Sequence, residues 1–264
     1  MFILKKLTSI QNPFVKSLLS LKVRSKQRNL TGTFLIEGEK EIDLAIKGGY
    51  AINKILFYPG TCCENTIKRW SQHAELIEIS NEIFKKLAYR NSTEGVIGIA
   101  EVMNLALKNL NLGDNPLILI AQSIEKPGNI GAILRTADAA NLDAVIIADP
   151  KCDLYNPNVI RSSVGCLFTN QIAVGKTTEV LSFLKKNNIS IYCATLQNKN
   201  VYNKQDYTTP TAFVVGAEAT GLSQEWKKHA TKNVIIPMKG MVDSMNVSVS
   251  AAVLIFEAKR QRSI

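Results

Sequence analysis

The stretch Val234–Glu257 reads Val-Ile-Ile-Pro-Met-Lys-Gly-Met-Val-Asp-Ser-Met-Asn-Val-Ser-Val-Ser-Ala-Ala-Val-Leu-Ile-Phe-Glu. Its first residues, Val234–Ile236, predict a buried strand, and Pro237 ends it because proline has no N–H to donate. Ser244 and Asn246 are good N-cap residues, and apolar residues at helical spacing follow them. The chain therefore places a polar loop and a helix N-terminus at the carboxyl end of a buried strand, where ligands bind in open α/β sheets.

The carboxyl-terminal half repeats this alternation of buried strand and helix. Apolar, β-branched runs predict strands at Leu117–Ala121, Ala144–Ala148, Gln171–Val174, Ser190–Ala194, Ala212–Val215 and Asn233–Ile236. Helical patterns separate them at Asn129–Ala140, Asn158–Val164, Thr177–Asn187, Leu222–Ala230 and Asn246–Arg260. Strands that are apolar throughout are typical of parallel sheets covered by helices on both faces. We predict a doubly wound, parallel-sheet α/β domain.

The amino-terminal half predicts a second, smaller domain. Short strands and helices alternate over residues 1–104, as in a compact α/β unit of about a hundred residues. A polar stretch rich in Asn and Leu follows and ends in Gly113-Asp114-Asn115-Pro116. We therefore expect an amino-terminal domain at 1–104, a linker at 105–115 and the parallel-sheet domain at 116–264.

The composition excludes several classes of protein. No apolar run reaches the roughly 18–20 residues that a membrane span needs, and the first residues do not form a secretory signal. We therefore expect a cytoplasmic protein with no membrane partner. The five cysteines form no Cys-x-x-Cys pair, so neither a disulfide framework nor a metal site is expected.

A net charge of +10 indicates an anionic partner. Basic residues crowd the start of the chain, before the first acid at Glu37: Lys5, Lys6, Lys16, Lys22, Arg24, Lys26 and Arg28. We expect Lys16–Arg28 to be one helix that binds nucleic acid, although a solvated basic helix face has the same composition. Such charge supplies affinity and salt dependence but not sequence specificity.

A first polar loop, residues 126–137, follows the predicted strand at Leu117–Ala121. Asn129 is predicted to be an N-cap, Gly131 permits close backbone approach, and Arg135 lies about one and a half turns along the helix. The loop lacks Gly-x-Gly-x-x-Gly, which argues against a nucleotide-dependent oxidoreductase. An ordinary capped helix with an exposed arginine remains an alternative.

A second polar loop, residues 215–223, follows another apolar strand. Gly216 and Gly221 bracket Glu218 in it. The functional interpretation is a backbone cradle for a small ligand, whereas the structural one is a carboxylate that is favoured near a helix N-terminus. Together the three loops predict a rim for a polar cofactor and a nucleic-acid backbone, formed by Asn129, Arg135, Glu218, Ser244 and Asn246. Composition and spacing do not name the reaction.

Three motifs in this order resemble one known family. They are Asn129-x-Gly131-x-x-x-Arg135-Thr-Ala, Gly216-x-Glu218-x-x-Gly221-x-Ser223, and Ile236-Pro-Met-x-Gly240-x-x-x-Ser244-Met245-Asn246-Val247-Ser248. The chain resembles the SpoU (TrmH-like) RNA 2′-O-ribose methyltransferases of the SPOUT superfamily. The segment Arg161-Ser-Ser163-Val-Gly165 also looks like a family pattern, and the amino-terminal half resembles the ribosomal-protein-like domain that binds RNA substrate in many of these enzymes.

The resemblance implies S-adenosylmethionine as cofactor, a trefoil knot that holds the last helix, and a homodimer with active sites built from both subunits. It implies cofactor contacts at Gly216, Gly221, Ile236, Met238 and Met245. It implies a catalytic set of Arg135, Glu218, Ser244 and Asn246, supported by Asn129. RNA contacts are expected at Lys16, Lys22, Arg24, Lys26, Arg28 and Arg161. The family commonly has leucine at position 245, and flexible methionine should serve there.

The expected reaction is attack of a ribose 2′-hydroxyl on the sulfonium methyl group. Arg135 is the family's usual candidate for activating that hydroxyl, yet a guanidinium is always protonated and is a poor base. We favour a role in which Arg135 binds the neighbouring phosphate and stabilises alkoxide charge; the alternative is proton transfer to a phosphate or to Glu218. We expect the substrate to be 23S ribosomal RNA. Transfer RNA and a non-catalytic RNA-binding role are the alternatives.

Overall fold

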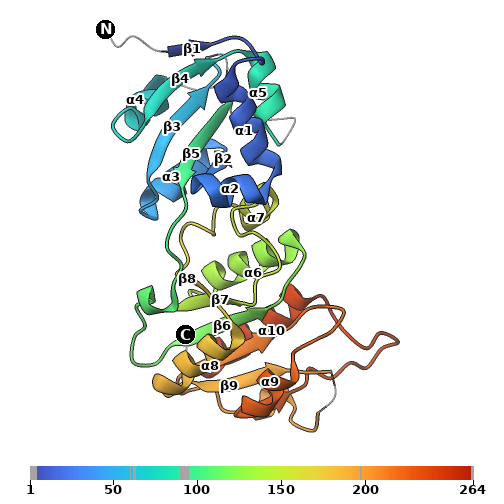
Figure 1. The fold of residues 1–264 in the computed structure, drawn as a ribbon. Helices are drawn as coiled ribbons and strands as arrows, with labels where there is room; N and C mark the ends of the chain where they lie inside the picture. The colour runs from blue at the N-terminus through green and yellow to red at the C-terminus, as the bar shows by residue number, and fades with distance from the viewer. Residues whose placement is uncertain (1–4, 60, 62–63, 90–94, 197, 263–264) are drawn as a thin grey trace. The chain divides into compact units, whose positions relative to one another are not determined.

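The computed structural model describes residues 5–59, 61, 64–89, 95–196 and 198–262 (Figure 1). The chain forms two compact units. The first unit comprises the chain up to Met103 together with Leu154–Thr169, and the second comprises Asn104–Asp153 and the chain from Asn170 onward. Among the helices described, none is long and apolar enough to cross a membrane.

The first unit is built on a mixed five-stranded sheet of order β1-β4-β3-β5-β2. Its strands are β1 (Lys5–Leu7), β2 (Thr33–Glu37), β3 (Ile52–Phe57), β4 (Glu75–Ile79) and β5 (Val96–Glu101). Its helices are α1 (Pro13–Val23), α2 (Ser25–Thr31), α3 (Glu39–Lys47), α4 (Glu64–Trp70), α5 (Asn81–Leu87) and α7 (Pro157–Ser163). β5 pairs antiparallel with β2 and β3, whereas β4 pairs parallel with β1 and β3. Apolar side chains of α1 and α5 share one buried cluster with those of the sheet.

The single basic helix predicted at Lys16–Arg28 is wrong, because the chain breaks at Arg24. This residue has extended backbone angles, and α1 ends before it while α2 begins after it. The Arg28 side chain, only 2% exposed, turns back and donates to the carbonyl oxygens of Leu21 at 2.5 Å and Lys22 at 3.4 Å. Arg28 therefore satisfies carbonyls at the end of α1 and does not belong to the exposed basic surface.

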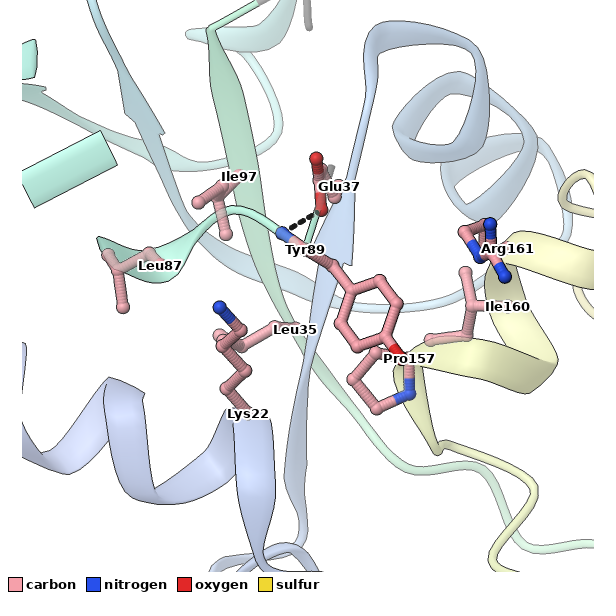
Figure 2. Close-up of a pocket in the computed structure, with 9 residues that line it drawn as sticks. All are labelled: Lys22, Leu35, Glu37, Leu87, Tyr89, Ile97, Pro157, Ile160 and Arg161. Carbon is pink, nitrogen blue, oxygen red and sulfur yellow. Dashed lines mark hydrogen bonds between the residues drawn. The ribbon is translucent and has the colours of Figure 1, made fainter. Parts of the chain in front are cut away.

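The chain after α5 is fixed by side chains from two other elements of the first unit (Figure 2). Lys22 of α1 donates to the carbonyl oxygens of Lys86 at 3.0 Å and Ala88 at 2.7 Å. Glu37, at the end of β2, accepts from the backbone N–H of Tyr89 at 2.6 Å. These bonds hold the backbone up to Tyr89 in one place.

The segment Leu154–Thr169 packs on the first sheet, although the sequence continues from it into β8 of the second unit. The Tyr155 ring stacks on Phe34 of β2 with centroids 4.3 Å apart, and Phe168 meets Tyr50 edge to face at 5.1 Å. The Tyr155 hydroxyl also accepts from the backbone N–H of Met103 at 3.0 Å. This segment lies inside the range 116–264, which the sequence predicts to be one domain.

The second unit confirms the predicted parallel sheet, with six strands in the order β11-β9-β10-β6-β7-β8. The strands are β6 (Leu117–Gln122), β7 (Ala144–Ala148), β8 (Ile172–Gly175), β9 (Ser190–Ala194), β10 (Thr211–Val215) and β11 (Lys232–Val234). The helices are α6 (Pro127–Ala139), α8 (Thr177–Lys186), α9 (Gln224–His229) and α10 (Val247–Gln261), with short 3-10 turns η1 (Leu107–Asn109) and η2 (Tyr202–Lys204). Every residue of β6, β7 and β10 is buried, as helix crossovers require.

Two local predictions change in the second unit. The last strand ends at Val234 rather than Ile236, and Ile235 makes only an isolated bridge to Val201. The stretch predicted to be a linker, 105–115, contains η1, and three of its leucines pack against the core of the second unit: Leu107, Leu110 and Leu112. Their burial makes this stretch part of the second unit's edge.

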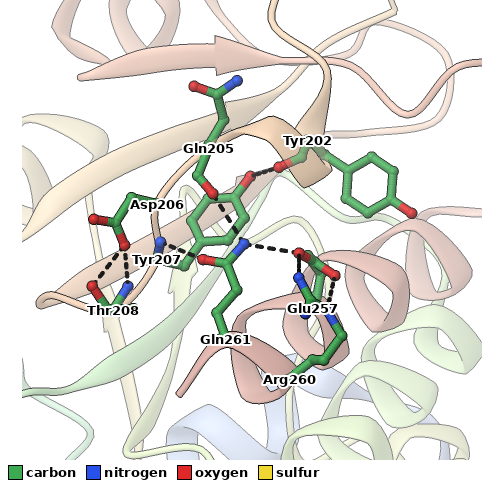
Figure 3. A network of polar contacts seen from close by, with 8 residues as sticks. All are labelled: Tyr202, Gln205, Asp206, Tyr207, Thr208, Glu257, Arg260 and Gln261. Atoms are coloured by element: carbon green, nitrogen blue, oxygen red, sulfur yellow. Dashed lines mark hydrogen bonds and ion pairs between the residues drawn. The ribbon is translucent and has the colours of Figure 1, made fainter. Parts of the chain in front are cut away.

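The carboxyl end of α10 is held by a network of polar contacts (Figure 3). The Gln261 side chain accepts from the backbone N–H of Tyr207 at 2.8 Å and donates to the carbonyl oxygen of Gln205 at 2.9 Å. The Arg262 guanidinium donates to the carbonyl oxygens of Tyr207 at 2.8 Å and Thr209 at 2.6 Å. Since α10 also packs against α6 and β10, the position of its amino end follows from these anchors.

Replacing Phe168 with alanine tests whether Leu154–Thr169 stabilises the first unit. The ring is 3% exposed, so we expect a loss of about 3–5 kcal/mol in the free energy of unfolding of that unit. Urea titration with hydrogen exchange of β2 and β5 measures it, while β6 and β10 should keep their midpoints. The control is Leu30→Ala, at a residue that is 78% exposed. Equal midpoints for the two variants would contradict the structural role of the segment.

Candidate functional site

A cavity of about 710 Å³ opens in the second unit, at the carboxyl ends of β9 and β10. Its walls come from residues 194–196 and Asn198 after β9, from residues 215–222 after β10, and from the loop that leads into α10. The strand order reverses at β6, which pairs with both β10 and β7. The chain runs from β6 to β7 and β8 on one side of it, and the later strands β9, β10 and β11 lie on the other side. A cavity beside such a reversal of strand order is where open α/β sheets bind their ligands.

All five residues predicted to contact a cofactor line this cavity. They are Gly216, Gly221, Ile236, Met238 and Met245. The wall formed by Ala194, Thr195 and Leu196 is absent from the sequence prediction, because the polar residues after β9 include no glycine and form no motif of the family. Its signal was the predicted strand itself, since β9 lies beside β10 in the sheet.

The loop at Gly216 closes tightly on itself. A Cβ atom at this position would lie 2.5 Å from the carbonyl carbon of Gly221 and 2.6 Å from the nitrogen of Leu222. Gly221 has a φ of +63°, and its N–H donates to the carbonyl oxygen of Ala217 at 2.8 Å. Glycine at 216 is therefore required by the loop's own backbone, before any ligand is considered.

Polar side chains from all three predicted loops meet at Glu218. The Asn129 amide donates to the Glu218 carboxylate at 2.6 Å, and the Asn246 amide donates to Asn129 Oδ1 at 3.0 Å and to Glu218 at 3.3 Å. Lys126 forms an ion pair with the same carboxylate. The hydrogen bonds from Lys126 and Asn129 lower the pKa of Glu218, so the group is ionised at neutral pH.

Asn129 reaches this cluster because it is not the N-cap that the sequence predicted. Lys126 precedes the helix and Pro127 is its first residue, which suits proline's fixed φ and missing N–H. Asn129 is thus the third helical residue, and its side chain is free to bond across to Glu218 and Asn246. Lys126 itself was missed, since a single exposed lysine before a helix carries no specific signal.

Asn246 is the N-cap of α10, as predicted. Its Oδ1 accepts from the backbone N–H of Ser248 at 2.9 Å and from the Ser248 hydroxyl at 2.6 Å. The same side chain therefore uses its oxygen to start α10 and its NH₂ group to bind Asn129 and Glu218. Ser244 lines the cavity, and its hydroxyl donates to Asp243 at 3.1 Å.

Two of the five predicted rim residues, Asn129 and Arg135, do not line the cavity of the described chain. Asn129 bonds to Glu218 and Asn246, which do line it. Arg135 lies farther along α6, and its side chain is exposed. The described residues also contain no group of three or more His, Cys, Asp and Glu side chains that could hold a metal ion.

The cavity loop is supported from behind by Gln122 at the end of β6. Its side-chain oxygen accepts from the backbone N–H of Ser223 at 3.0 Å, and the side chain is 6% exposed. Asp149, after β7, accepts from Thr177 Oγ1 at 2.5 Å, and Thr177 accepts in turn from Trp226 Nε1 at 2.9 Å. These bonds, of which the one between Trp226 and Thr177 is buried and the others are partly buried, fix the end of the loop.

The other predicted RNA contacts lie in the first unit. Lys16, Arg24 and Lys26 are exposed on α1, α2 and the break between them, and Arg161 is exposed on α7. Lys22 is half-buried, and its ammonium group donates to the carbonyl oxygens of Lys86 and Ala88 after α5. Burial lowers the pKa of Lys22. Four of the six predicted residues are thus exposed cations.

Comparisons with known proteins give a consistent result. The sequence model of the SpoU rRNA Methylase family matches residues 116–256, and that of the MRM3-like substrate binding domain matches residues 12–98. A Bacillus subtilis relative named 23S rRNA (guanosine(2553)-2′-O)-methyltransferase RlmP is 29% identical over 256 residues, which cover 97% of this chain and 100% of the relative. A Ralstonia nicotianae relative named 23S rRNA (guanosine-2′-O-)-methyltransferase RlmB is 33% identical, over 72% of this chain and 78% of the relative.

Solved structures resemble the whole chain as well. A crystal structure described as an RNA 2′-O ribose methyltransferase is 37% identical, with a TM-score of 0.84, over 98% of this chain and 100% of that one. An AdoMet-bound rRNA methyltransferase from Sinorhizobium meliloti is 26% identical, with a TM-score of 0.90, over 97% and 98%. The resemblance drawn from the three motifs is confirmed: the chain belongs to the SpoU rRNA methylase family.

Proposed function

We propose that this protein is an RNA methyltransferase that transfers a methyl group from S-adenosylmethionine to a ribose 2′-hydroxyl of 23S ribosomal RNA. The observation that carries the proposal is the meeting of Asn129, Glu218 and Asn246 beside a cavity lined by all five predicted cofactor residues. The names of the relatives from Bacillus and Ralstonia support the reaction and the class of RNA. Since those relatives are bacterial enzymes of ribosomal RNA, we place this protein in the cytoplasm.

The residues of the cavity fit S-adenosylmethionine. Its volume of about 710 Å³ lies within the range of small-molecule sites, roughly 300–1,000 Å³. Leu196, Ile236 and Met238 give it apolar walls, and the loop from Gly216 to Gly221 offers backbone groups. When bound there, the cofactor supplies an electrophilic methyl group. The relative from Sinorhizobium, whose structure is described as AdoMet-bound, supports this assignment.

In the proposed mechanism Glu218 orients other groups and does not take the proton from the 2′-hydroxyl. Its carboxylate already accepts from Lys126, Asn129 and Asn246, and its lowered pKa makes it a weak base. We assign it the task of holding the two amides, which in turn fix the start of α10 and the adjacent Ser244 at the cavity.

We assign Arg135 to the RNA strand. A guanidinium binds phosphate through two parallel N–H bonds and stabilises negative charge on a neighbouring oxygen. Because Arg135 is exposed and does not line the cavity of its own chain, we propose that it completes the cavity of a second copy in a homodimer. Val249 and Phe256, which lie on α10 and are 48% and 51% exposed, supply an apolar stripe for that interface.

We further propose that the two cavity loops form a trefoil knot that holds α10, and that the first unit selects the RNA site. Lys16, Arg24, Lys26 and Arg161 are the exposed cations for that role. Calorimetry with S-adenosylmethionine and methyl transfer to 23S ribosomal RNA, with mapping of methylated riboses, test the function. Methylation of transfer RNA but not of 23S ribosomal RNA would make transfer RNA the substrate. Absent cofactor binding would leave a non-catalytic RNA-binding protein.

Replacing Lys126 with methionine should shift the pH dependence of methyl transfer. Lys126 is the largest cause of the lowered pKa of Glu218, so its loss should raise that pKa. An ionised Glu218 is needed to hold Asn129 and Asn246, and activity is lost as pH falls through its pKa. The acid limb of kcat against pH should therefore move to higher pH in Lys126→Met and stay near its normal position in Lys126→Arg. An unmoved limb in Lys126→Met would refute this use of the ion pair.

Mixing two inactive variants tests whether Arg135 acts across a dimer. Arg135→Ala and Asn246→Ala should each abolish methyl transfer, and Arg135→Ala should still bind S-adenosylmethionine. If each site combines one chain's cavity with Arg135 of the partner subunit, random heterodimers hold one intact site, and about a quarter of wild-type activity should return on mixing. No recovery after confirmed subunit exchange would mean that Arg135 serves its own chain's cavity or none.

A further inference from the structure

Tyr89 presents an exposed aromatic ring on a fixed backbone in the first unit. The residue is 44% exposed, and its N–H donates to Glu37 at the end of β2. The carbonyl of the preceding residue, Ala88, accepts from Lys22 at 2.7 Å. A single exposed apolar residue is ordinary. Tyr89 differs from such a residue because hydrogen bonds with Lys22 of α1 and Glu37 of β2 fix its backbone. These bonds hold the ring at the surface.

The guanidinium of Arg161 lies over this ring, with its central carbon 5.7 Å from the ring centroid. Arg161 comes from α7, and its side chain is exposed. Figure 2 shows Tyr89 beside Pro157 and Arg161, on the side of the pocket opposite Leu87. A cation over an aromatic face is favourable, and here the pair forms a flat, positively charged surface that faces solvent.

The pocket beneath the ring is too small for a ligand. Its volume is about 30 Å³, roughly the share of one water molecule, and its floor is apolar, with Leu35, Ile97 and Ile160. A ligand must therefore lie across the ring and the guanidinium instead of entering. The last turn of α5, just before Tyr89, adds two exposed cations, Lys85 and Lys86.

We propose that Tyr89 and Arg161 form a stacking platform for an unpaired base of the RNA substrate, with the flanking phosphates facing Lys85 and Lys86. This inference rests on the proposed function and extends it. Single-stranded RNA combines planar bases with an anionic backbone, and proteins bind its unpaired bases on aromatic rings and guanidinium planes. An acidic peptide would use the cations and leave the ring unused. The platform thus selects unpaired RNA over a helix, with little preference among bases.

Two RNA probes separate stacking from charge. One is a fluorescein-labelled oligoadenylate of about 12 nucleotides, within the range of site sizes for single-strand binding. The other is an abasic ribose-phosphate oligomer of the same length, which keeps the phosphates and lacks every base. Fluorescence anisotropy with the full chain gives the affinity for each. Wild type should bind oligoadenylate more tightly than the abasic probe.

Tyr89→Ala should weaken oligoadenylate binding about 5- to 150-fold, the measured range for loss of one base–aromatic stack. Its affinity for the abasic probe should stay at the wild-type level. Tyr89→Phe should retain the preference, and Tyr89→Leu, which keeps apolar bulk for the fold, should lose it. The matched control is Tyr202→Ala in the second unit, where the backbone oxygen accepts from Tyr207; it should bind both probes as wild type does.

The platform is refuted if wild type fails to prefer or bind oligoadenylate, if Tyr89→Leu retains the preference, or if both probes weaken equally. Calorimetry with S-adenosylmethionine on the same samples keeps this result apart from the proposed function. If wild type binds the cofactor and transfers methyl groups normally but any of those outcomes is seen, only the platform is refuted and the proposed function stands. Absent cofactor binding by wild type removes the proposed function instead.

Discussion

The Glu218 carboxylate is the acceptor on which the geometry of the second unit's cavity depends. It joins the loop after β10 to Asn129 of α6 and to Asn246, which starts α10. Asn129 is 9% exposed, and a buried amide that loses its acceptor carries the full cost of its desolvation. The anchors of Gln261 and Arg262 at the other end of α10 oppose sliding of that helix. The cavity is therefore bounded by loops whose ends are fixed by bonds to distant parts of the same unit.

The aromatic cluster around Phe34 sets how the two units are connected along the chain. Because Tyr155 and Phe168 pack with Phe34 in the first unit, the chain passes between the units after Met103, after Asp153 and after Thr169. A single linker would give one such passage. Three passages mean that neither unit is a continuous stretch of sequence, and that Arg161 is carried by the first unit although it lies between two strands of the second unit in sequence.

Sequence patterns predicted the features that depend on residues close together in the chain. The parallel strands, the N-cap at Asn246 and the loops around Glu218 follow from apolar runs and from glycine or polar residues at strand ends. Choices made over long distances were not predictable in this way. Arg24 carries no mark of a helix break, and Arg28 looks like any surface cation until its bonds to Leu21 and Lys22 are known. Tyr155 and Phe168 would suit either core, so only their packing assigns them to the first unit.

Both proposed binding surfaces use a carboxylate as an anchor, and in both a lysine lies beside it. Glu218 holds Asn129 and pairs with Lys126, while Glu37 holds the N–H of Tyr89 and lies close enough to Lys22 to affect its pKa. A charged acceptor forms stronger hydrogen bonds than a neutral one, which makes it suited to fixing a loop.

The same charge repels phosphate, and a protein of net charge +10 that binds RNA gains nothing from an uncompensated anion at its site. An exposed ion pair contributes little to folding, so the stability of the fold does not account for Lys126. The position of Lys126 is better explained by the positive charge that it adds beside the cavity. There it allows Glu218 to remain ionised and hold its amides while the RNA backbone approaches.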